Sequence, residues 1–368
     1  MLDTLFSRIK EVLWPGSEAA ALPMMDGALK PNRRLDDAAP VGEPLPGCDD
    51  LVVCADGALL VSAGSRIHRL YEDERSVWAE CGGRIDALAA DPASGTVFAA
   101  IAGQGVRAFD REGRATGALL DSVEGRALRC VTALAVLPDG KVAIAEGSAD
   151  NTAEAWSRDL LERRASGRIV LAAADLKSAT TIAADLAWPS GLLPRSDGSL
   201  WFSEAWRHRI RSIGVAGGIA SPVLDNLPGY PGRISADASG DLWLACFALR
   251  TQLIEFVLRE RGYCEQMLAA VDPRYWIAPS LRATGHYLEP LQGGAIKKLG
   301  IVKPWAPPRS YGLVLRLSAD GTILDSLHSR AGGEHHGITS VRRRGDRVIA
   351  VSRGGGRLLS CTPGGASA

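Results

Sequence analysis

The stretch that decides the fold is DGSLWFSEAWRHRIRSI, residues 197–213. A tight Asp-Gly turn leads into an alternating apolar strand, and a second strand follows a short polar link. The same construction recurs as DGALLVSAGSRIHRL at 56–70, SGTVFAAIAGQGVRAFD at 94–110, DGKVAIAEGS at 139–148, SGDLWLACF at 239–247 and GDRVIAVSRGGGRLLSC at 345–361. Six copies of a turn-and-strand unit predict an all-β protein with six four-stranded blades around a central channel, a six-bladed β-propeller.

The chain outside the six repeats falls into an N-terminal extension and an insertion. Residues 1–14 carry apolar side chains at helical spacing and end before a Pro-Gly pair, which predicts a short amphipathic N-terminal helix. We expect residues 1–43 to form this helix and an extended arm, and residues 44–368 to form the propeller. The insertion at 248–310 has helical stretches and is predicted to be a lid over one mouth of the channel, either as a substrate cap or for packing alone.

The composition excludes several classes of function. The 368 residues include 42 basic and 42 acidic side chains, so no net charge attracts nucleic acid or an anionic membrane. Apolar runs are too short for a transmembrane helix. The seven cysteines are odd in number and form no C-x-x-C pair, which argues against a disulfide framework and a thiolate zinc site. We therefore expect a reduced, cytoplasmic protein, whose oligomeric state the sequence leaves open.

Four stretches occur in the order found in one known family. They are SRDLLERRASGRI at 157–169, WPSGL at 188–192, GSLWFSEAWRHRIRSI at 198–213 and NLPGYPGRISADASGDLWLAC at 226–246. On these motifs the chain resembles strictosidine-synthase-like proteins of the gluconolactonase–paraoxonase superfamily of six-bladed propellers. The resemblance implies a small-molecule site in the axial channel, and we predict an enzyme that hydrolyses an ester or a lactone.

The resemblance also locates a metal site that is altered in this chain. Hydrolytic members hold a divalent cation, usually calcium, with a Glu, two Asn and an Asp. The corresponding positions are Asp49, Thr132, Ser190 and Glu204. All four still carry oxygen, which a hard cation requires, but two are hydroxyls. We therefore predict no bound metal, and calcium at this degraded site remains the alternative.

Where paraoxonase-like members carry an Asp-Asn pair, this chain has Gly232-Arg233. A guanidinium near the channel axis repels a divalent cation and forms charge-assisted hydrogen bonds with carboxylates. Our hypothesis is that Arg233 takes the electrostatic role of the lost metal by neutralising Asp49 and Glu204. The alternative is that Arg233 turns outward into solvent.

Strictosidine synthases use a Glu of the last blade as their acid/base. GGEHHGITSV, residues 332–341, resembles the stretch before it, but no carboxylate falls at the expected positions 337–339. The nearest ionisable groups are Glu334, His335 and His336, and an imidazole titrates near neutral pH. Together with Glu204 they are the predicted catalytic residues. The simpler interpretation places one His in a loop hydrogen bond and the other at the surface.

The remaining predictions concern the ligand. The substrate-binding candidates are Asp49, Thr132, Ser190, Arg233, Tyr230 and His286. Most of the tryptophans are expected to pack between blades, and one or two are expected to line the pocket and to favour an aromatic small molecule. Two alternatives to the hydrolase stay open: a metal-free amine–aldehyde condensation, which lacks its last-blade Glu here, and a propeller that binds a ligand without chemistry.

Overall fold

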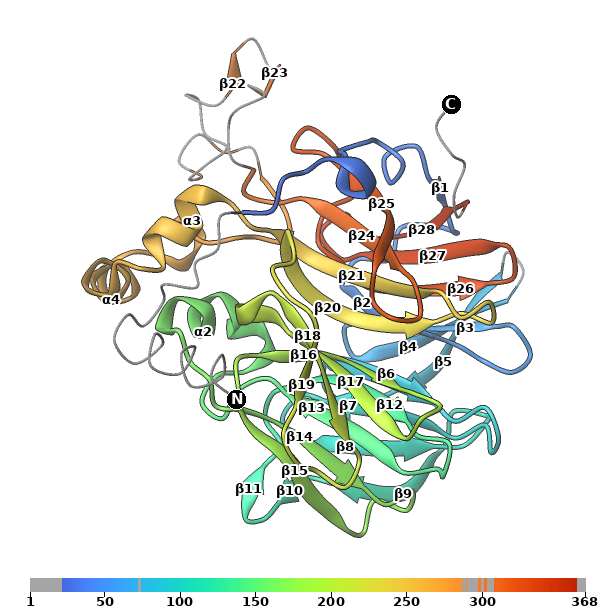
Figure 1. Ribbon diagram of the computed structural model, residues 1–368. Coiled ribbons are helices and arrows are strands. Elements are labelled where there is room, and N and C mark those ends of the chain that lie inside the picture. Colours follow the sequence, from blue (N-terminus) through green and yellow to red (C-terminus); the bar gives the residue numbers. More distant parts are fainter. Residues whose placement is uncertain are drawn as a thin grey trace.

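The computed structural model describes residues 22–71, 74–284, 286, 289, 297–298, 301–302 and 308–362. Within these residues the chain forms a six-bladed β-propeller, and each blade is a four-stranded antiparallel sheet (Figure 1). The fold class predicted from the turn-and-strand repeats is therefore confirmed. The helix predicted over residues 1–14 lies outside the described residues.

The blades follow one another along the chain, and the first strand of each is the innermost. Blade 1 has β2 (Cys48–Val53), β3 (Leu59–Ala63), β4 (Arg66–Tyr71) and β5 (Glu74–Glu80). Blade 2 has β6 (Ile85–Ala90), β7 (Val97–Ile101), β8 (Gly105–Phe109) and β9 (Ala115–Leu120). Blade 3 has β12 (Val131–Val136), β13 (Val142–Glu146), β14 (Gly167–Ala172) and β15 (Ala179–Leu186).

The second half of the ring has the same order. Blade 4 has β16 (Pro189–Pro194), β17 (Ser199–Glu204), β18 (Arg209–Gly214) and β19 (Ser221–Leu224). Blade 5 has β20 (Gly229–Ala236), β21 (Leu242–Leu249), β24 (Gly312–Leu317) and β25 (Ile323–Ser329). Blade 6 has β26 (Ile338–Arg344), β27 (Arg347–Ser352), β28 (Arg357–Cys361) and β1 (Ala39–Pro40). Two hairpins lie outside the blades: β10 (Ser122–Val123) with β11 (Arg126–Ala127), and β22 (Lys297–Lys298) with β23 (Ile301–Val302).

Each repeat marks the turn between the first two strands of a blade. In blade 4 the Asp197 carboxylate accepts the backbone N–H of Ser199 at 2.9 Å, and Gly198 between them has φ +80°. Gly adopts this left-handed conformation without steric cost, and the Asp side chain closes the turn. Asp56 and Asp139 make the same contact in blades 1 and 3. The Asp-Gly pairs thus fix where each blade begins its second strand.

The ring closes through both ends of the chain. The inner strands β2, β6, β12, β16, β20 and β26 contact one another in this order, and β26 contacts β2. β1 comes from the N-terminal arm and pairs with β28, with Ala39 opposite Ser360 and Pro40 opposite Leu359. The arm also crosses β25, where Arg34 forms an ion pair with Asp325 at 2.6 Å. The segment predicted to be an extended arm ahead of the propeller therefore supplies the outer strand of blade 6.

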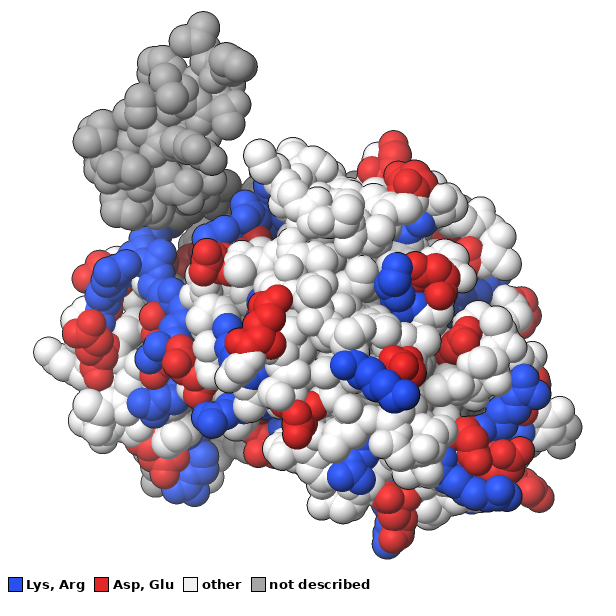
Figure 2. All heavy atoms as spheres, turned by 90° about the horizontal axis from the view of Figure 1, so that it is seen from below, with Lys and Arg blue, Asp and Glu red and all other residues white. Residues whose placement is uncertain are grey.

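The core lies between the blades, because both faces of each sheet are covered by a neighbour. One hydrophobic cluster joins Phe98 and Val106 of blade 2 to Leu134 and Ile144 of blade 3. Similar clusters join the other blades. The surface shown in Figure 2 carries basic and acidic side chains interspersed, as a chain with equal numbers of both allows.

The helices lie together on one side of the blades (Figure 1). α2 (Trp156–Glu162) follows the short η2 (Ala153–Ala155) and contacts α4 (Arg261–Ala270), which also contacts α3 (Gln252–Val257). The insertion between β21 and β24 contains α3, α4 and η4 (Pro273–Tyr275), whereas η1 (Gly27–Leu29) and η3 (Ala205–Arg207) come from other parts of the sequence. The described helices include none with the length and apolar character needed to span a membrane.

Candidate functional site

The six inner strands share an irregularity that aims side chains into the channel. In each strand the pairing with its neighbour shifts register, at one place in five of the strands and at two places in β20, which marks a β-bulge or a similar irregularity. A bulged residue leaves the ladder and its side chain is redirected, which is why bulges recur beside binding sites. The residues at these shifts are Asp49 and Asp50, Asp86, Thr132, Ser190, Gly232 and Arg233, and Thr339.

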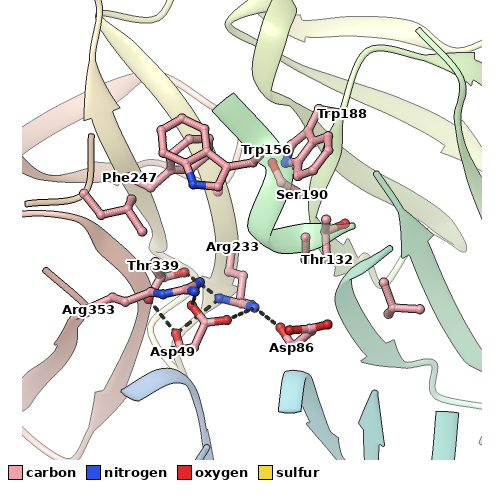
Figure 3. A pocket seen from close by; sticks show the side chains of 14 residues that line it. Asp49, Asp86, Thr132, Trp156, Trp188, Ser190, Arg233, Phe247, Thr339 and Arg353 are labelled. Carbon is pink, nitrogen blue, oxygen red and sulfur yellow. Dashed lines mark hydrogen bonds and ion pairs between the residues drawn. The ribbon is translucent and has the colours of Figure 1, made fainter. Parts of the chain in front are cut away.

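All of these residues except Asp50 line one pocket, together with side chains from the loops and insertions. The pocket encloses about 500 Å³ of space free of atoms, part of it open to solvent. Asp49, Asp86, Arg233 and Arg353 form its charged floor, and the upper walls are mainly apolar (Figure 3).

The walls are mainly aromatic. Trp156, the first residue of α2, meets Phe247 edge to face with 5.5 Å between ring centroids. Trp188 stacks on Trp206 at 5.0 Å, and the Trp206 indole N–H donates to the buried Asp159 at 2.8 Å. These contacts hold the rings in place, so that the pocket presents rigid apolar surface to a ligand. Two tryptophans, Trp156 and Trp188, line the pocket.

Arg233 is the most heavily bonded group of the floor. It reaches from blade 5, and its Nη1 donates to the backbone carbonyls of Asp49 at 3.2 Å and Thr339 at 3.1 Å. Its Nη2 donates to Asp49 Oδ2 at 3.3 Å and to the Asp86 carbonyl. Its Nε lies 3.1 Å from Asp50 Oδ2, close enough for an ion pair but not aligned for a hydrogen bond. One guanidinium thereby joins blades 1, 2, 5 and 6.

Asp49 lies between two guanidiniums. Its Oδ2 faces Arg233, and its Oδ1 accepts from Arg353 Nη1 at 3.1 Å. Burial alone would raise the pKa of Asp49, but Arg353 and Arg233 outweigh burial and lower it. Asp49 is therefore held as a carboxylate. Arg353 keeps 27% of its side chain exposed, and Asp49 is its single carboxylate partner among the described residues.

Asp86 has a different environment. Its carboxylate receives Arg84 Nε at 2.6 Å, and Arg84 also pairs with Glu154 of η2. Burial raises the pKa of Asp86, the neighbouring Asp49 adds to the rise, and Arg84 offsets it only in part. A buried carboxyl group with a raised pKa in a pocket is a candidate acid/base.

The three hydroxyl groups of the ring serve to join blades. Thr132 donates to the carbonyl of Pro189 at 2.5 Å, and Ser190 donates to Pro231 at 2.7 Å. Thr339 donates to Asp49 at 2.5 Å. Each hydroxyl thus donates its only proton to the inner strand of the next blade.

The residues at the degraded metal site, where calcium was the alternative, do not fit a divalent cation. A calcium ion takes six to eight oxygen ligands, several of them charged. The positively charged Arg233 already holds Asp49, Thr132 and Ser190 are bonded to neighbouring strands, and Glu204 faces elsewhere. The described residues contain no group of three His, Cys, Asp or Glu side chains arranged to hold a metal.

The expected contact between Arg233 and Glu204 is not formed. Glu204 ends β17, where Arg209 on β18 stands directly opposite and pairs with it at 2.7 Å. Its other oxygen accepts the backbone N–H of Ala187 at 2.8 Å, and the side chain is fully buried. Successive strand residues point to opposite faces, so the preceding Ser203 bonds to Ser190 and Gly232 while Glu204 points away from them. Glu204 is not among the residues that line the pocket.

The candidates of the last blade lie outside the axial pocket. His336 is buried; its Nε2 donates to the carbonyl of Arg330 at 2.8 Å and its Nδ1 accepts from Ser310 at 2.7 Å. Burial lowers the pKa of both His336 and His335. Glu334 is exposed and lines a second hollow with His336. This arrangement matches the simpler interpretation of one His in a loop hydrogen bond.

Two further candidates also fall outside the pocket lining. Tyr230 is fully buried and packs edge-on against His208, with 4.6 Å between ring centroids, and against Trp206. His286 is exposed on the insertion. Asp49, Thr132, Ser190 and Arg233 are the predicted binding residues that line the pocket.

Sequence reasoning missed Asp86, Thr339, Arg353 and Leu281 as pocket residues. A signal for some of them existed in the repeats. The residue that reaches the channel precedes the turn residue by seven positions in three blades and by eight in blade 2. The pairs are Asp49 and Asp56, Thr132 and Asp139, Ser190 and Asp197, and, in blade 2, Asp86 and Ser94. Leu281 had no such signal, because it comes from the insertion.

Comparison with known proteins agrees with this architecture, although no family model matches the chain. The adipocyte plasma membrane-associated protein of Bos taurus is 26% identical over 336 residues, covering 84% of this chain and 74% of that protein. Strictosidine synthase-like protein 3 of Arabidopsis thaliana is 27% identical over 199 residues, covering 52% of this chain and 51% of that protein. A gluconolactonase from Xanthomonas campestris superposes with a TM-score of 0.57 at 14% identity, covering 90% of this chain and 91% of that chain.

The chain is therefore a six-bladed propeller with an axial pocket, and its fold is similar to that of gluconolactonases. In sequence the chain is similar to the strictosidine synthase-like proteins and to the adipocyte plasma membrane-associated proteins.

Proposed function

We propose that this propeller is a metal-independent hydrolase of small esters or lactones that carry an aromatic or apolar group. The observation that carries the proposal is the pairing of two unlike groups in one pocket. Asp86 is a buried carboxyl group with a raised pKa, and Arg353 is a partly exposed guanidinium with donors to spare. A general base and an oxyanion donor are the two groups that ester hydrolysis needs.

The chemistry follows from these positions. The Asp86 carboxylate takes a proton from water, and the hydroxide attacks the carbonyl carbon of the ester. Arg353 donates hydrogen bonds to the oxyanion that forms, while Trp156 and Trp188 bind the apolar group and exclude bulk water. The tetrahedral intermediate then expels the alkoxide, which recovers the proton from Asp86. The sum is ester plus water to acid plus alcohol.

The condensation chemistry of strictosidine synthases has less support. Its acid/base belongs to the last blade, where Thr339 lines the pocket and donates to Asp49. A hydroxyl group whose proton is already donated is a poor acid/base at neutral pH.

The test is a panel of aryl esters and aromatic lactones, assayed with and without a chelator. We expect chelator-insensitive turnover, and Asp86→Asn should lower kcat by about 100-fold or more because the general base is lost. The matched control is Asp91→Asn, since Asp91 is a partly exposed carboxylate outside the pocket that accepts a turn N–H just after the same strand. Full activity in D86N would refute the role of Asp86. Binding of panel compounds without turnover would favour the ligand-binding propeller.

A further inference from the structure

The floor of the pocket contains a cage made of oxygen atoms. Five oxygens from three inner strands face the Arg233 guanidinium: the side chains of Asp49 and Asp50, and the backbone carbonyls of Asp49, Asp86 and Thr339. Two of the five are carboxylate oxygens and three are carbonyl oxygens. Both kinds are the ligands that calcium prefers in proteins.

The cage is built independently of Arg233. Asp50 is almost fully buried, and it also accepts the backbone N–H groups of Leu51 at 2.8 Å and Leu88 at 2.9 Å, and the Ser340 hydroxyl at 2.7 Å. These bonds fix its carboxylate between blades 1, 2 and 6. Removal of Arg233 therefore leaves a preformed, negatively charged hollow rather than a flexible loop.

We propose that Arg233 is the permanent occupant of a latent divalent-cation site, and that replacing it with a small side chain converts the cage into a calcium site. The guanidinium supplies one positive charge at the centre of the oxygens, where a cation would supply two. Because it is covalently attached, the cage is filled whatever the metal concentration. The wild-type protein consequently has no need of a metal to hold blades 1, 2, 5 and 6 together.

The neighbouring Arg353 provides a matched control. It lines the same pocket and pairs with Asp49, but its side chain is 27% exposed and its guanidinium contacts none of the other cage oxygens among the described residues. Replacing Arg353 removes one positive charge from the pocket and leaves Arg233 in the cage. A calcium site that depends on vacating the cage should therefore appear in Arg233 variants alone.

The experiment compares wild type, Arg233→Ala, Arg233→Asn and Arg353→Ala as purified full-length chains. The melting temperature is measured in chelator and in calcium at about 0.1 to 10 mM, the range in which weak protein sites fill. Terbium luminescence excited through tryptophan reports occupation directly, because Trp156 and Trp188 line the same pocket. Arg233→Asn adds an amide oxygen, a further ligand of the kind calcium accepts.

We expect calcium to raise the melting temperature of R233A and R233N by about 5 °C at saturating concentration, because it binds only the folded state. Wild type and R353A should not respond, and adding Asp49→Asn to R233A should abolish the response. The proposal is overturned if wild type responds as strongly as R233A, or if calcium neither stabilises nor restores the fold of both Arg233 variants. These readouts measure metal binding alone, so they stand or fall separately from the proposed hydrolysis.

Discussion

Leu35 tests whether the N-terminal arm is part of the propeller core. It precedes the region predicted to form the propeller, yet its side chain is fully buried in a cluster with Trp243, Val314 and Leu327. Its backbone N–H also donates to the carbonyl of His328 on β25 at 3.1 Å. Leu35→Ala would leave a cavity, because the surrounding blade residues are already tightly packed and cannot easily move in to fill it.

The magnitude follows from that burial. Leu→Ala substitutions at fully buried sites cost about 3 to 5 kcal/mol, of which the cavity contributes a large part. For a domain of this size that corresponds to a fall in melting temperature of about 5 to 10 °C. The matched control is Met24→Ala on the same arm, where 75% of the side chain is exposed and the expected cost is below about 0.5 kcal/mol.

Urea unfolding followed by tryptophan fluorescence measures the free energy of unfolding of both variants. If the free energies of unfolding of L35A and M24A differ by less than about 0.5 kcal/mol, the arm does not contribute to the core, and closure of the ring through β1 does not stabilise the protein. A loss confined to L35A would show that the two ends of the chain hold the ring closed together.

Three further predictions follow from single contacts. Burial lowers the pKa of His328 in the folded protein to about 4, so the unfolded chain binds the proton more readily. The free energy of unfolding should therefore fall by at most about 3 kcal/mol through His328 as the pH drops from 6.5 to about 4. His328→Gln should flatten a plot of melting temperature against pH. Trp156→Ala should raise KM for aryl esters about tenfold but leave acetyl esters of small alcohols unaffected, whereas Trp78→Ala outside the pocket should change neither. Gly354→Ala places a Cβ against the carbonyl of Leu281, so it should cost about 1 to 3 kcal/mol and shift the relative KM values of bulky and small esters.

The blades could be predicted from the sequence because each carries its own local signal. The Asp197 side chain and Gly198 close their turn without help from any distant residue, so the repeat is visible in the sequence itself. The strand contributed by Ala39–Pro40 could not be predicted, because two residues carry no periodicity and their pairing depends on β28, more than 300 positions away.

The site was predicted only in part for a similar reason. Asp49 and Arg233 could be singled out because the family resemblance pointed to them. Glu204 was misplaced because its partner Arg209 is set by the β17–β18 register, which outweighs any attraction to the channel. Asp86 was missed because GGRIDALAA resembles no catalytic motif. Its chemistry arises from burial and from a bulge, and both exist only once the ring has closed.

The acids of the pocket floor divide into two roles according to what Arg233 binds. The guanidinium forms ion pairs with the carboxylates of Asp49 and Asp50, but at Asp86 it donates a hydrogen bond only to the backbone carbonyl. The pKa of Asp49 is accordingly lowered, whereas that of Asp86 is raised by burial. A divalent cation would draw every nearby carboxylate towards it. The Arg233 guanidinium pairs with Asp49 and Asp50, whereas the Asp86 carboxylate pairs with Arg84. If Arg233 takes the place of a cation as proposed, the same substitution supplies the bridge between blades and leaves Asp86 with the raised pKa that the proposed hydrolysis requires.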